Sequence, residues 1–306
     1  MKTLCFGSLN IDYVYTVPRF VAAGETLSSE TLETFSGGKG LNQSVALARA
    51  GAETYHAGAV GADGAFLLET LRAALVHTEH VETLSGVRTG HAVIQRNTAG
   101  ENCILLHGGA NRAVTREQID RTLARFSAGD LLVLQNEISE LAYLARQGKA
   151  RGMTVALNPS PMDGAVLPAL PYADILLLNE TEAAGLLGPD MPEDFADAAR
   201  LLHERFGAAV VLTLGARGSV YADGEALLAQ EAFPARAVDT TGAGDTFTGY
   251  FLAGMAEGRG AAWSLRFASA AAAAAVARPG AAPSIPARGE VAERLGEPLC
   301  EAEPKV

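Results

Sequence analysis

The sequence has 306 residues, of which 48% are hydrophobic and 19% are charged, and its formal net charge at pH 7 is −11. This length and composition are typical of a globular protein with one large α/β domain or two small ones. Because the chain is acidic and contains no basic run, it lacks the electrostatic footprint of a nucleic-acid-binding protein, and we expect no nucleic-acid partner.

Cysteine usage and apolar patterning indicate the compartment. The three cysteines, Cys5, Cys103 and Cys300, include no CxxC pair, so neither a disulfide framework nor a zinc site is indicated. The N-terminal apolar run is too short for a signal peptide, and no stretch approaches the ~18 apolar residues of a membrane span. The alanine-rich run from Ala268 to Ala277 predicts a tightly packed helix. We therefore expect a cytoplasmic protein with no membrane partner.

The chain opens with an apolar run at Thr3 to Phe6 that predicts a strand. Asn10 and Asp12 follow closely, and in open α/β sheets ligands bind outside the carboxyl ends of strands. An ionised carboxylate accepts two hydroxyl groups at once, which is what holding a sugar diol requires of Asp12. On the local pattern alone, an Asx-type turn explains both residues equally well.

Two stretches interrupt the expected alternation of strands and helices. Residues 13 to 35 contain strand-like pieces, and residues 90 to 107 contain two strand-like runs around a turn at Asn97 to Gly100. We expect the two stretches to pair as one small sheet that covers the active site and excludes water. The predicted division is a nucleotide- and sugar-binding core at 1–12, 36–90 and 108–306, with an inserted β lid at 13–35 and 91–107.

A glycine-rich turn, SGGKGLNQ, begins at residue 36 and precedes a helix. Gly37, Gly38 and Gly40 allow close approach of the backbone to a ligand, and Lys39 and Asn42 add donors. The turn is not a Walker A loop, because Gly40 follows Lys39 where that pattern needs Ser or Thr. No GxGxxG follows the first strand, so a dinucleotide-binding dehydrogenase loses its main support.

The alternation resumes with a strand near Thr54 to Val60 and a helix from Ala65 to about Val76. His77, Glu79 and His80 follow, and we expect them to end this helix at a surface loop. A metal site there is disfavoured because no third ligand converges on the histidines. Solvated histidines are the preferred interpretation.

From residue 115 the alternation is regular. We expect helices at 115–127 and 139–151 and strands at 131–135, 153–157, 175–178 and 210–214. Apolar strands of this kind predict a mainly parallel sheet that is covered on both faces. Glu137, Asn158 and Asn179 each follow a strand, at the edge where ligands bind.

Two further features lie at the same edge of the predicted sheet. Glu182 lies in the first turn of a helix that begins near Asn179, so helix capping explains part of its pattern. Orienting a magnesium-bound water is the functional alternative for Glu182. A second glycine-flanked loop, Gly215 to Gly218, follows the strand at 210–214 and is able to admit a nucleotide.

The stretch DTTGAGDTF, from Asp239 to Phe247, indicates phosphoryl transfer. Gly242 and Gly244 let backbone N–H groups converge on an anion at a helix start, where the dipole favours negative charge. Asp245 lies beside this cradle, where a carboxylate can accept the proton of a substrate hydroxyl. An N-cap is the simpler interpretation of Asp245 alone. A helix cap does not require two glycines and a second acid, Asp239, so the whole stretch favours a catalytic role.

In this order and spacing, Asn10 with Asp12, SGGKGLN, NETE, TLGARG and DTTGAGDTF resemble the ribokinase family of sugar kinases over roughly residues 3 to 290. The resemblance implies a three-layer α/β/α core with a mainly parallel sheet and a small β-sheet lid. It also implies transfer of the γ-phosphate of ATP to a primary hydroxyl of a sugar or nucleoside. Mg²⁺ and an activating K⁺ are the implied cofactors.

The same resemblance implies roles for particular residues. Asp245 would be the catalytic base, beside the backbone of Gly242, Ala243 and Gly244. Sugar contacts would fall on Asn10, Asp12, Gly38, Lys39, Gly40, Asn42 and Glu137. Nucleotide contacts would fall on Asn179, Thr213, Gly215, Gly218, Gly244 and Ser269, and Glu182 joins this set by its position. The K⁺ site would comprise Asp239, Thr241, Ala275, Arg278, Gly280 and Ser284, mostly through backbone carbonyls.

Within the family, the hairpin GENCILLHGGAN and Glu137 favour D-ribose as the acceptor, phosphorylated on its primary 5-hydroxyl. The alternatives are 2-deoxyribose, fructose, adenosine or pseudouridine as acceptor, or a non-catalytic sugar-binding regulator. His91 and Ser269 depart from the residues expected in the lid and the adenine pocket, and they bear on specificity. We also expect a homodimer formed through the lid and a frayed C-terminal tail, EPLCEAEPKV.

Overall fold

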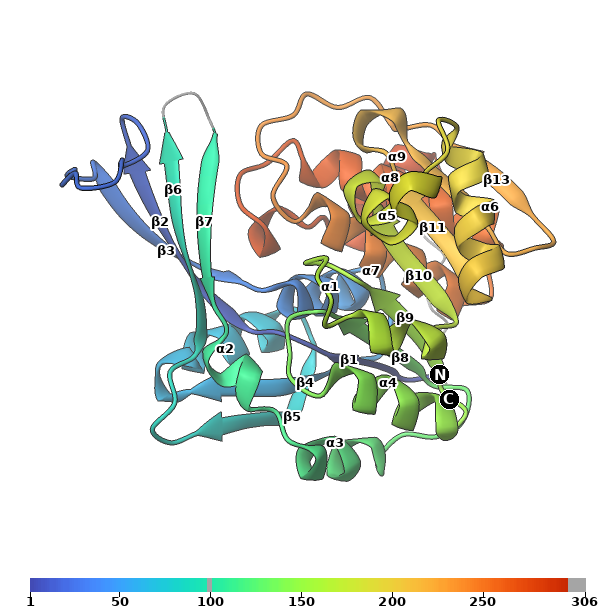
Figure 1. The fold of residues 1–306 in the computed structure, drawn as a ribbon, viewed down its shortest axis with the longest axis horizontal. Helices are drawn as coiled ribbons and strands as arrows, with labels where there is room; N and C mark the ends of the chain where they lie inside the picture. The colour runs from blue at the N-terminus through green and yellow to red at the C-terminus, as the bar shows by residue number, and fades with distance from the viewer. Residues whose placement is uncertain (98–100, 297–306) are drawn as a thin grey trace.

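The computed structural model describes residues 1–97 and 101–296 and shows three layers, with a large sheet between two groups of helices (Figure 1). The sheet has nine strands in the order β13-β12-β11-β10-β9-β8-β1-β4-β5. All neighbours from β5 to β11 are parallel, and β12 and β13 are antiparallel. The strands are β1 (Thr3–Phe6), β4 (Thr54–Gly61), β5 (His77–Leu84), β8 (Leu131–Gln135), β9 (Thr154–Asn158), β10 (Ile175–Asn179), β11 (Ala209–Thr213), β12 (Ser219–Ala222) and β13 (Leu227–Gln230).

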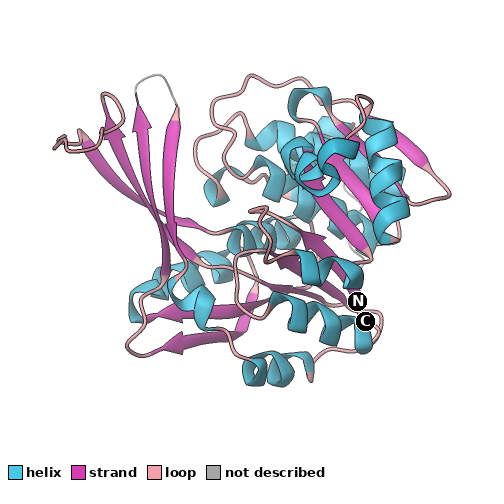
Figure 2. Cartoon of the chain, viewed as in Figure 1, coloured by secondary structure: helices cyan, strands magenta, loops and turns pink. Residues whose placement is uncertain are grey.

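Helices cover both faces of this sheet, which confirms the predicted architecture (Figure 2). Central strands are buried on both faces, so alternate residues of β1 join different cores: Leu4 and Phe6 pack in one and Cys5 in the other. The first core is covered by α3 (Arg116–Leu123), α4 (Leu141–Ala150), α5 (Glu180–Leu187) and α6 (Phe195–Phe206). The second is covered by α1 (Lys39–Arg49), α2 (Ala65–Ala73), α7 (Ala243–Ala256), α8 (Gly260–Ala275) and α9 (Arg288–Leu295).

A second sheet of four strands, in the order β3-β2-β6-β7, rises beside the core (Figure 1). It is formed by the two stretches that interrupt the α/β alternation: β2 (Asn10–Val17) and β3 (Thr31–Gly37), with β6 (Gly90–Asn97) and β7 (Asn102–His107). β2 and β6 pair in parallel, and the two outer pairs are antiparallel. We refer to this sheet as the lid. Residues 98–100 of the expected hairpin turn, and the whole tail from residue 297, lie outside the described residues.

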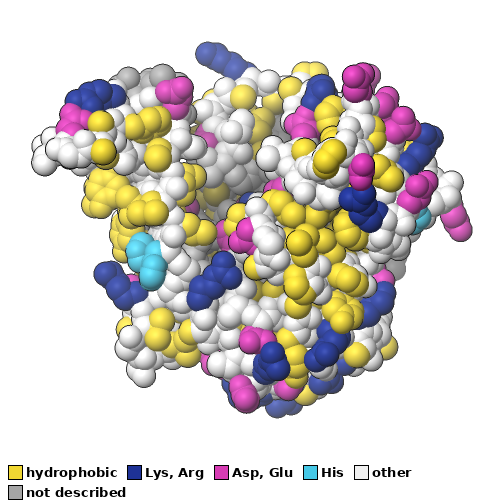
Figure 3. All heavy atoms as spheres, in the orientation of Figure 1, with side chains coloured by type: hydrophobic (Ala, Val, Ile, Leu, Met, Phe, Trp, Pro, Cys, Tyr) yellow, Lys and Arg dark blue, Asp and Glu magenta, His cyan; other side chains and the backbone are white. Residues whose placement is uncertain are grey.

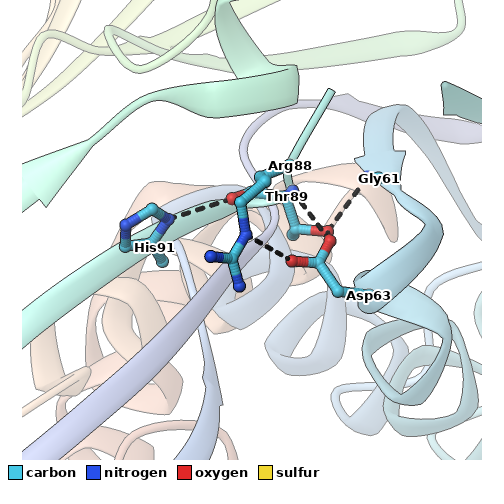
Figure 4. A network of polar contacts seen from close by, with 5 residues as sticks. All are labelled: Gly61, Asp63, Arg88, Thr89 and His91. Carbon is cyan, nitrogen blue, oxygen red and sulfur yellow. Dashed lines mark hydrogen bonds and ion pairs between the residues drawn. The ribbon is translucent and has the colours of Figure 1, made fainter. Parts of the chain in front are cut away.

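Figure 4 shows how the start of β6 is fixed to the core. The carboxylate of Asp63 accepts hydrogen bonds from the backbone and hydroxyl of Thr89, at 2.9 and 2.6 Å, and from Arg88 at 3.3 Å. The Thr89 hydroxyl in turn accepts the N–H of Gly61 at 2.9 Å. The lid therefore joins the core through a dense polar network at its base.

One expected element is wrong. The helix α2 ends at Ala73, and His77, Glu79 and His80 lie on the edge strand β5 and not in a surface loop. The sequence of β5 is polar because an edge strand faces water over much of its surface. His77 still packs, since its ring stacks on Tyr55 with 4.4 Å between the ring centroids.

A second difference between expectation and structure lies at the other end of the large sheet. The short antiparallel strands β12 and β13 were not expected from the sequence, and they extend the sheet beyond β11.

In residues 1–97 and 101–296, no helix is both long and apolar enough to cross a membrane. Within the same described ranges, no group of three or more His, Cys, Asp or Glu side chains is arranged to hold a metal ion.

Candidate active site

The surface is hollowed between the lid and the C-terminal half of the core (Figure 3). Three adjoining cavities open there, of about 690, 250 and 450 Å³. The largest lies between the lid and the loops that contain Asp239 and Gly280. The second contains Lys39 and Asp245, and the third contains Gly215 and Ser269. Thr240 lines all three cavities, so they lie next to one another.

Asp245 lies at the start of α7 with its carboxylate directed at α1. Gly242, in the left-handed conformation at φ 74°, is the N-cap of α7, and its position in the helix places Asp245 in the first turn. The carboxylate accepts one hydrogen bond from Asn42 Nδ2 at 3.0 Å and one from Gln43 Nε2 at 2.9 Å. The N-cap interpretation of Asp245 is therefore wrong, because its oxygens bind side chains of another helix.

Gln43 is a site residue that the sequence did not reveal. It is fully buried, and its side-chain oxygen accepts a hydrogen bond from Gln135 Nε2 at 2.7 Å. Its nitrogen donates to Asp245 and also lies 3.3 Å from Asn158 Oδ1. A glutamine inside a helix has no distinctive pattern, and only the packing of α1 against α7 brings it to Asp245.

At the other end of the site, Glu137 joins the loop after β1 to the glycine-rich turn. Its carboxylate accepts hydrogen bonds from the Ser8 hydroxyl and from the backbone N–H of Lys39, the latter at 3.1 Å. The Ser8 hydroxyl accepts the N–H of Gly40 at 3.2 Å. A Cβ at Gly40 would lie only 2.4 Å from the nitrogen of Ser8, so this close backbone approach requires glycine.

Asn10 and Asp12 lie on β2, which excludes the Asx-turn interpretation. The side chain of Asn10 is held by Asn111, whose Nδ2 donates to Asn10 Oδ1 at 2.7 Å. Asn111 is a second positioning residue that sequence reasoning missed. Asp12 faces the large cavity, and its carboxylate fills the space beside Gly37, where a Cβ would lie 2.0 Å from Asp12 Oδ2.

Burial and neighbouring charges shift the pKa values of several groups in the site. Burial, with the nearby charge of Glu137, raises the pKa of Asp12 to about 7. Burial also raises the pKa of Glu137. For Lys39, burial lowers the pKa, but the carboxylates of Asp245, Glu137 and Glu182 outweigh it and the net pKa is raised. Lys39 is therefore a cation held among carboxylates, at the position where a polar acceptor would meet them.

The predicted nucleotide residues surround the two smaller cavities. Asn179 and Glu182 form a capping box at the start of α5, with Glu182 N donating to Asn179 Oδ1 at 2.9 Å and Asn179 N to Glu182 Oε2 at 3.0 Å. Capping thus accounts for their pairing, while both side chains also line the cavity of Asp245. Thr213 lies between the two cavities. Gly215, Gly218 and Ser269 line the third.

The family model for pfkB family carbohydrate kinases matches residues 1–288. The chain belongs to this family. It is a carbohydrate kinase, which is a phosphotransferase with an alcohol acceptor.

Known pfkB relatives match nearly the whole chain. A ribokinase of Haemophilus influenzae is 36% identical over 303 residues, covering 96% of this chain and 98% of the relative. The structure of Arabidopsis thaliana ribokinase complexed with ribose and ATP superposes with a TM-score of 0.86 at 36% identity, covering 96% of this chain and 98% of that one. A deoxyribokinase of Salmonella typhi is 34% identical, covering 82% of this chain and 84% of the relative.

In this pfkB kinase, His91 lies on the face of the lid opposite to Asp12. Asp12 pairs with Ala92 across β2 and β6, and alternate residues of a strand face opposite sides. Ala92 and Ile94 therefore share the face of Asp12, and Ile94 lines the large cavity. The ring of His91 lies against His107 and Tyr13, with centroids 5.0 and 6.0 Å apart.

The predicted cation residues lie in two loops that contact one another. Asp239 Oδ1 accepts the N–H and hydroxyl of Thr241, at 2.9 and 2.6 Å, and its Oδ2 accepts the N–H of Gly280 at 2.9 Å. Burial raises the pKa of Asp239, but these hydrogen bonds and the charge of Arg96 outweigh it and lower the pKa. The carboxylate therefore stays ionised. Its oxygens and the surrounding backbone carbonyls are the donors that a hard cation takes.

The remaining three residues of that set lie close by but make other contacts. The Ala275 carbonyl accepts the N–H of Arg278 at 3.0 Å, and the Ser284 hydroxyl donates to the Ala281 carbonyl at 2.8 Å. The guanidinium of Arg278 binds Glu290. The Arg278 side chain is therefore unsuited to a cation, and the oxygens of these residues are the donors that a cation could take.

Proposed function

We propose that this pfkB kinase is an ATP-dependent ribokinase, which transfers the γ-phosphate of ATP to the primary 5-hydroxyl of D-ribose. The observation that supports it most is the place of Asp245. Asp245 is only 8% exposed, and it lies in one cavity with Lys39, Gly242 and Gly244. A base between an acceptor site and a phosphate cradle is the arrangement that in-line phosphoryl transfer needs.

The proposed roles rest on the positions of these residues together with the resemblance to ribokinases. Asp12 and Lys39 hold the ring hydroxyls of the sugar, and Asn10, Asn42 and Glu137 complete the polar contacts. Asp245 accepts the proton of the primary hydroxyl as its oxygen attacks the γ-phosphorus. The backbone N–H groups of Gly242, Ala243 and Gly244 stabilise the negative charge of the transferred group.

Two cations belong to the proposal. When bound, Mg²⁺ neutralises phosphate charge, and the cavity that contains Glu182 and Asn179 is where a carboxylate could orient its waters. K⁺ is proposed between the loops of Asp239 and Gly280, where the donors are oxygens. Both assignments are checked by replacing the cation: Na⁺ in place of K⁺ should lower the rate, and removal of Mg²⁺ should abolish it.

Location and assembly complete the proposal. A cytoplasmic location agrees with the described cysteines, Cys5 and Cys103, which are free thiols. We also propose a homodimer through the lid, whose two edge strands, β3 and β7, each pair on one side only within residues 1–97 and 101–296.

The test is ADP release from Mg-ATP in potassium buffer, with ribose, 2-deoxyribose, fructose, adenosine and pseudouridine offered separately. We expect kcat/KM for ribose to exceed the others by at least about 100-fold. A preference for another acceptor would replace ribose and keep the kinase assignment. Silence with every acceptor would support a sugar-binding regulator instead. Asp245→Asn is the matched variant, and we expect kcat to fall by several orders of magnitude while nucleotide still binds.

A further inference from the structure

The cavity of about 450 Å³ beside the glycine loop is the largest apolar space in the site. It is enclosed by the loop after β11, by the segment 232–237 and by α8. Alanine is the commonest lining residue, and Phe233, Phe247 and Val276 add larger apolar side chains. Its neighbour contains the phosphate cradle at Gly242 to Gly244, so this cavity receives the base of the donor nucleotide in the proposed function.

Among the described residues that line this cavity, none has a carboxylate, amide, guanidinium or imidazole side chain. Three hydroxyl residues remain. Thr213 Oγ1 donates to the Leu178 carbonyl at 3.3 Å, and Ser269 Oγ donates to the Glu231 carbonyl at 3.2 Å. Thr240 also lines the phosphate cavity and so lies at the other end of the nucleotide. No side chain is therefore placed to donate a hydrogen bond to the base edge.

Three backbone donors of the glycine loop are also occupied internally. Leu214 N donates to the Gly218 carbonyl at 2.8 Å, Arg217 N to the Leu214 carbonyl at 3.0 Å, and Gly218 N to the Gly215 carbonyl at 3.1 Å. The loop thus presents a fixed shape, and its own hydrogen bonds occupy these donors.

We propose that this kinase accepts purine nucleoside triphosphates as a class, with ATP, GTP and ITP as comparable donors, and that its base pocket selects by size. The inference rests on the proposed function and deepens it. Adenine carries an amino group at C6, whereas guanine and hypoxanthine carry a carbonyl. A pocket rejects the wrong group strongly only when its own buried polar group is left unpaired, and an apolar pocket discriminates weakly.

The size of the base is then the property that matters. A purine fills more of the cavity than a pyrimidine and makes more contacts with its alanine and phenylalanine walls. UTP and CTP leave part of the cavity empty, so they should be poorer donors than the three purine nucleotides.

The experiment measures kcat/KM for ATP, GTP, ITP, UTP and CTP with a saturating acceptor, and detects the sugar phosphate itself so that the readout is the same for each donor. We expect GTP and ITP to lie within about tenfold of ATP, and UTP and CTP to fall below all three. A preference for ATP over GTP of more than about 100-fold would overturn the inference.

A binding measurement separates this inference from the proposed function. ADP, GDP, IDP, UDP and CDP compete with a fluorescent nucleotide in the absence of any sugar. Equal affinity of the purine diphosphates without turnover of any acceptor would support the base pocket and refute the sugar kinase. Turnover of an acceptor with ATP but with no other donor would support the sugar kinase and refute the base-pocket inference.

A variant tests whether size is the selecting property. Ser269→Phe fills the cavity from α8, so kcat/KM should fall more for purine donors than for pyrimidine donors. The ratio of purine to pyrimidine kcat/KM should therefore decrease. The matched control is Ala262→Leu, an exposed position on the same helix outside the cavity, where the ratio should not change. An unchanged ratio in Ser269→Phe would contradict selection by size.

Discussion

Asp12 shows how function and stability compete at one residue. The carboxyl group has a pKa of about 7 in the folded protein against an ordinary value of 3.8, because burial and the charge of Glu137 disfavour its ionised form. The folded state therefore binds more protons than the unfolded state between these two pH values. Since stability falls with rising pH wherever the folded state binds more protons, the folded protein loses stability from about pH 4 to about pH 7.

Replacing Asp12 with Asn should raise the stability of the protein at pH 8. The gain should shrink as the pH falls and disappear near pH 4, where Asp12 is already neutral in both states. Its upper bound is about 4 kcal/mol, from the shift of about 3 pKa units. Denaturant unfolding at several pH values measures it, and the sugar KM should rise in the same variant.

Asp223 supplies the control with the opposite sign. Backbone hydrogen bonds, led by the one from Ala226 at 2.8 Å, lower the pKa of this carboxyl at the turn between β12 and β13. Asp223→Asn should therefore lose stability at pH 8 and leave the sugar KM unchanged. A stability of Asp12→Asn at or below that of the natural protein at pH 8 would refute the cost assigned to Asp12.

Gln43 should act on the rate and not on sugar binding. It lies outside the cavities and donates to Asp245, so Gln43→Leu removes one of the two side chains that orient the carboxylate. We expect kcat to fall about 10- to 100-fold with little change in the sugar KM. Steady-state kinetics measure both constants.

The conservative variant Gln43→Glu separates positioning of Asp245 from a general structural effect. A second carboxyl beside Asp245 holds a proton to higher pH, so the acidic limb of the kcat profile should move upward. A purely structural role for Gln43 would lower activity without moving the limb. A rise in KM alone, with kcat unchanged, would also contradict the assignment.

At the scale of elements, the site depends on how closely α1 and α7 approach. Gly249 of α7 lies against α1, where a Cβ would be 2.4 Å from Ala46 Cβ and 2.8 Å from Leu47 N. These two helices supply Asn42 and Asp245, whose hydrogen bond crosses the same interface. Glycine is therefore needed at 249 to bring Asn42 of α1 to Asp245.

Gly249→Ala should force the two helices apart. Overpacking of this kind costs about 1–3 kcal/mol of unfolding free energy, and the loss of alignment at Asp245 should lower kcat as well. A second variant adds Ala46→Gly, which removes the nearest colliding methyl group but leaves the backbone nitrogen of Leu47 at 2.8 Å, so we expect partial recovery. Recovery of kcat in the double variant supports the mechanism, and equal loss in both variants would contradict it.

The elements also show what a sequence can and cannot predict. The buried parallel strands were predicted because their apolar runs are continuous. The helix start at Gly242 to Asp245 was predicted because glycine and aspartate are distinctive at such a position. The edge strand β5 was missed because its sequence is polar, and β12 and β13 because they are short. Gln43 and Asn111 were missed because amides that orient other side chains have no sequence pattern.

At the scale of the whole molecule, the two faces of the lid have different chemistry. The face toward the core presents Asp12, Ile94 and Arg96 to the cavity. The opposite face presents Leu105 of β7, which is 71% exposed, and Leu32 of β3, which is 54% exposed. Apolar side chains gather on the lid in Figure 3. Exposed leucines on an open sheet are typical of a surface that pairs with another chain.

If the lid forms the dimer interface, a charge on its outer face should separate the two copies. The natural protein should sediment as two chains of 31.7 kDa, and Leu105→Lys should sediment as one, because burying an unpaired lysine costs more than a leucine contact returns. Leu167→Lys is the control, since Leu167 is 50% exposed on the core, and it should remain dimeric. A natural protein that sediments as a single chain at micromolar concentration, or a dimer that tolerates Leu105→Lys, would exclude this interface. Because Asp12 lies on the same sheet, loss of the dimer in Leu105→Lys should also raise the sugar KM more than it lowers kcat.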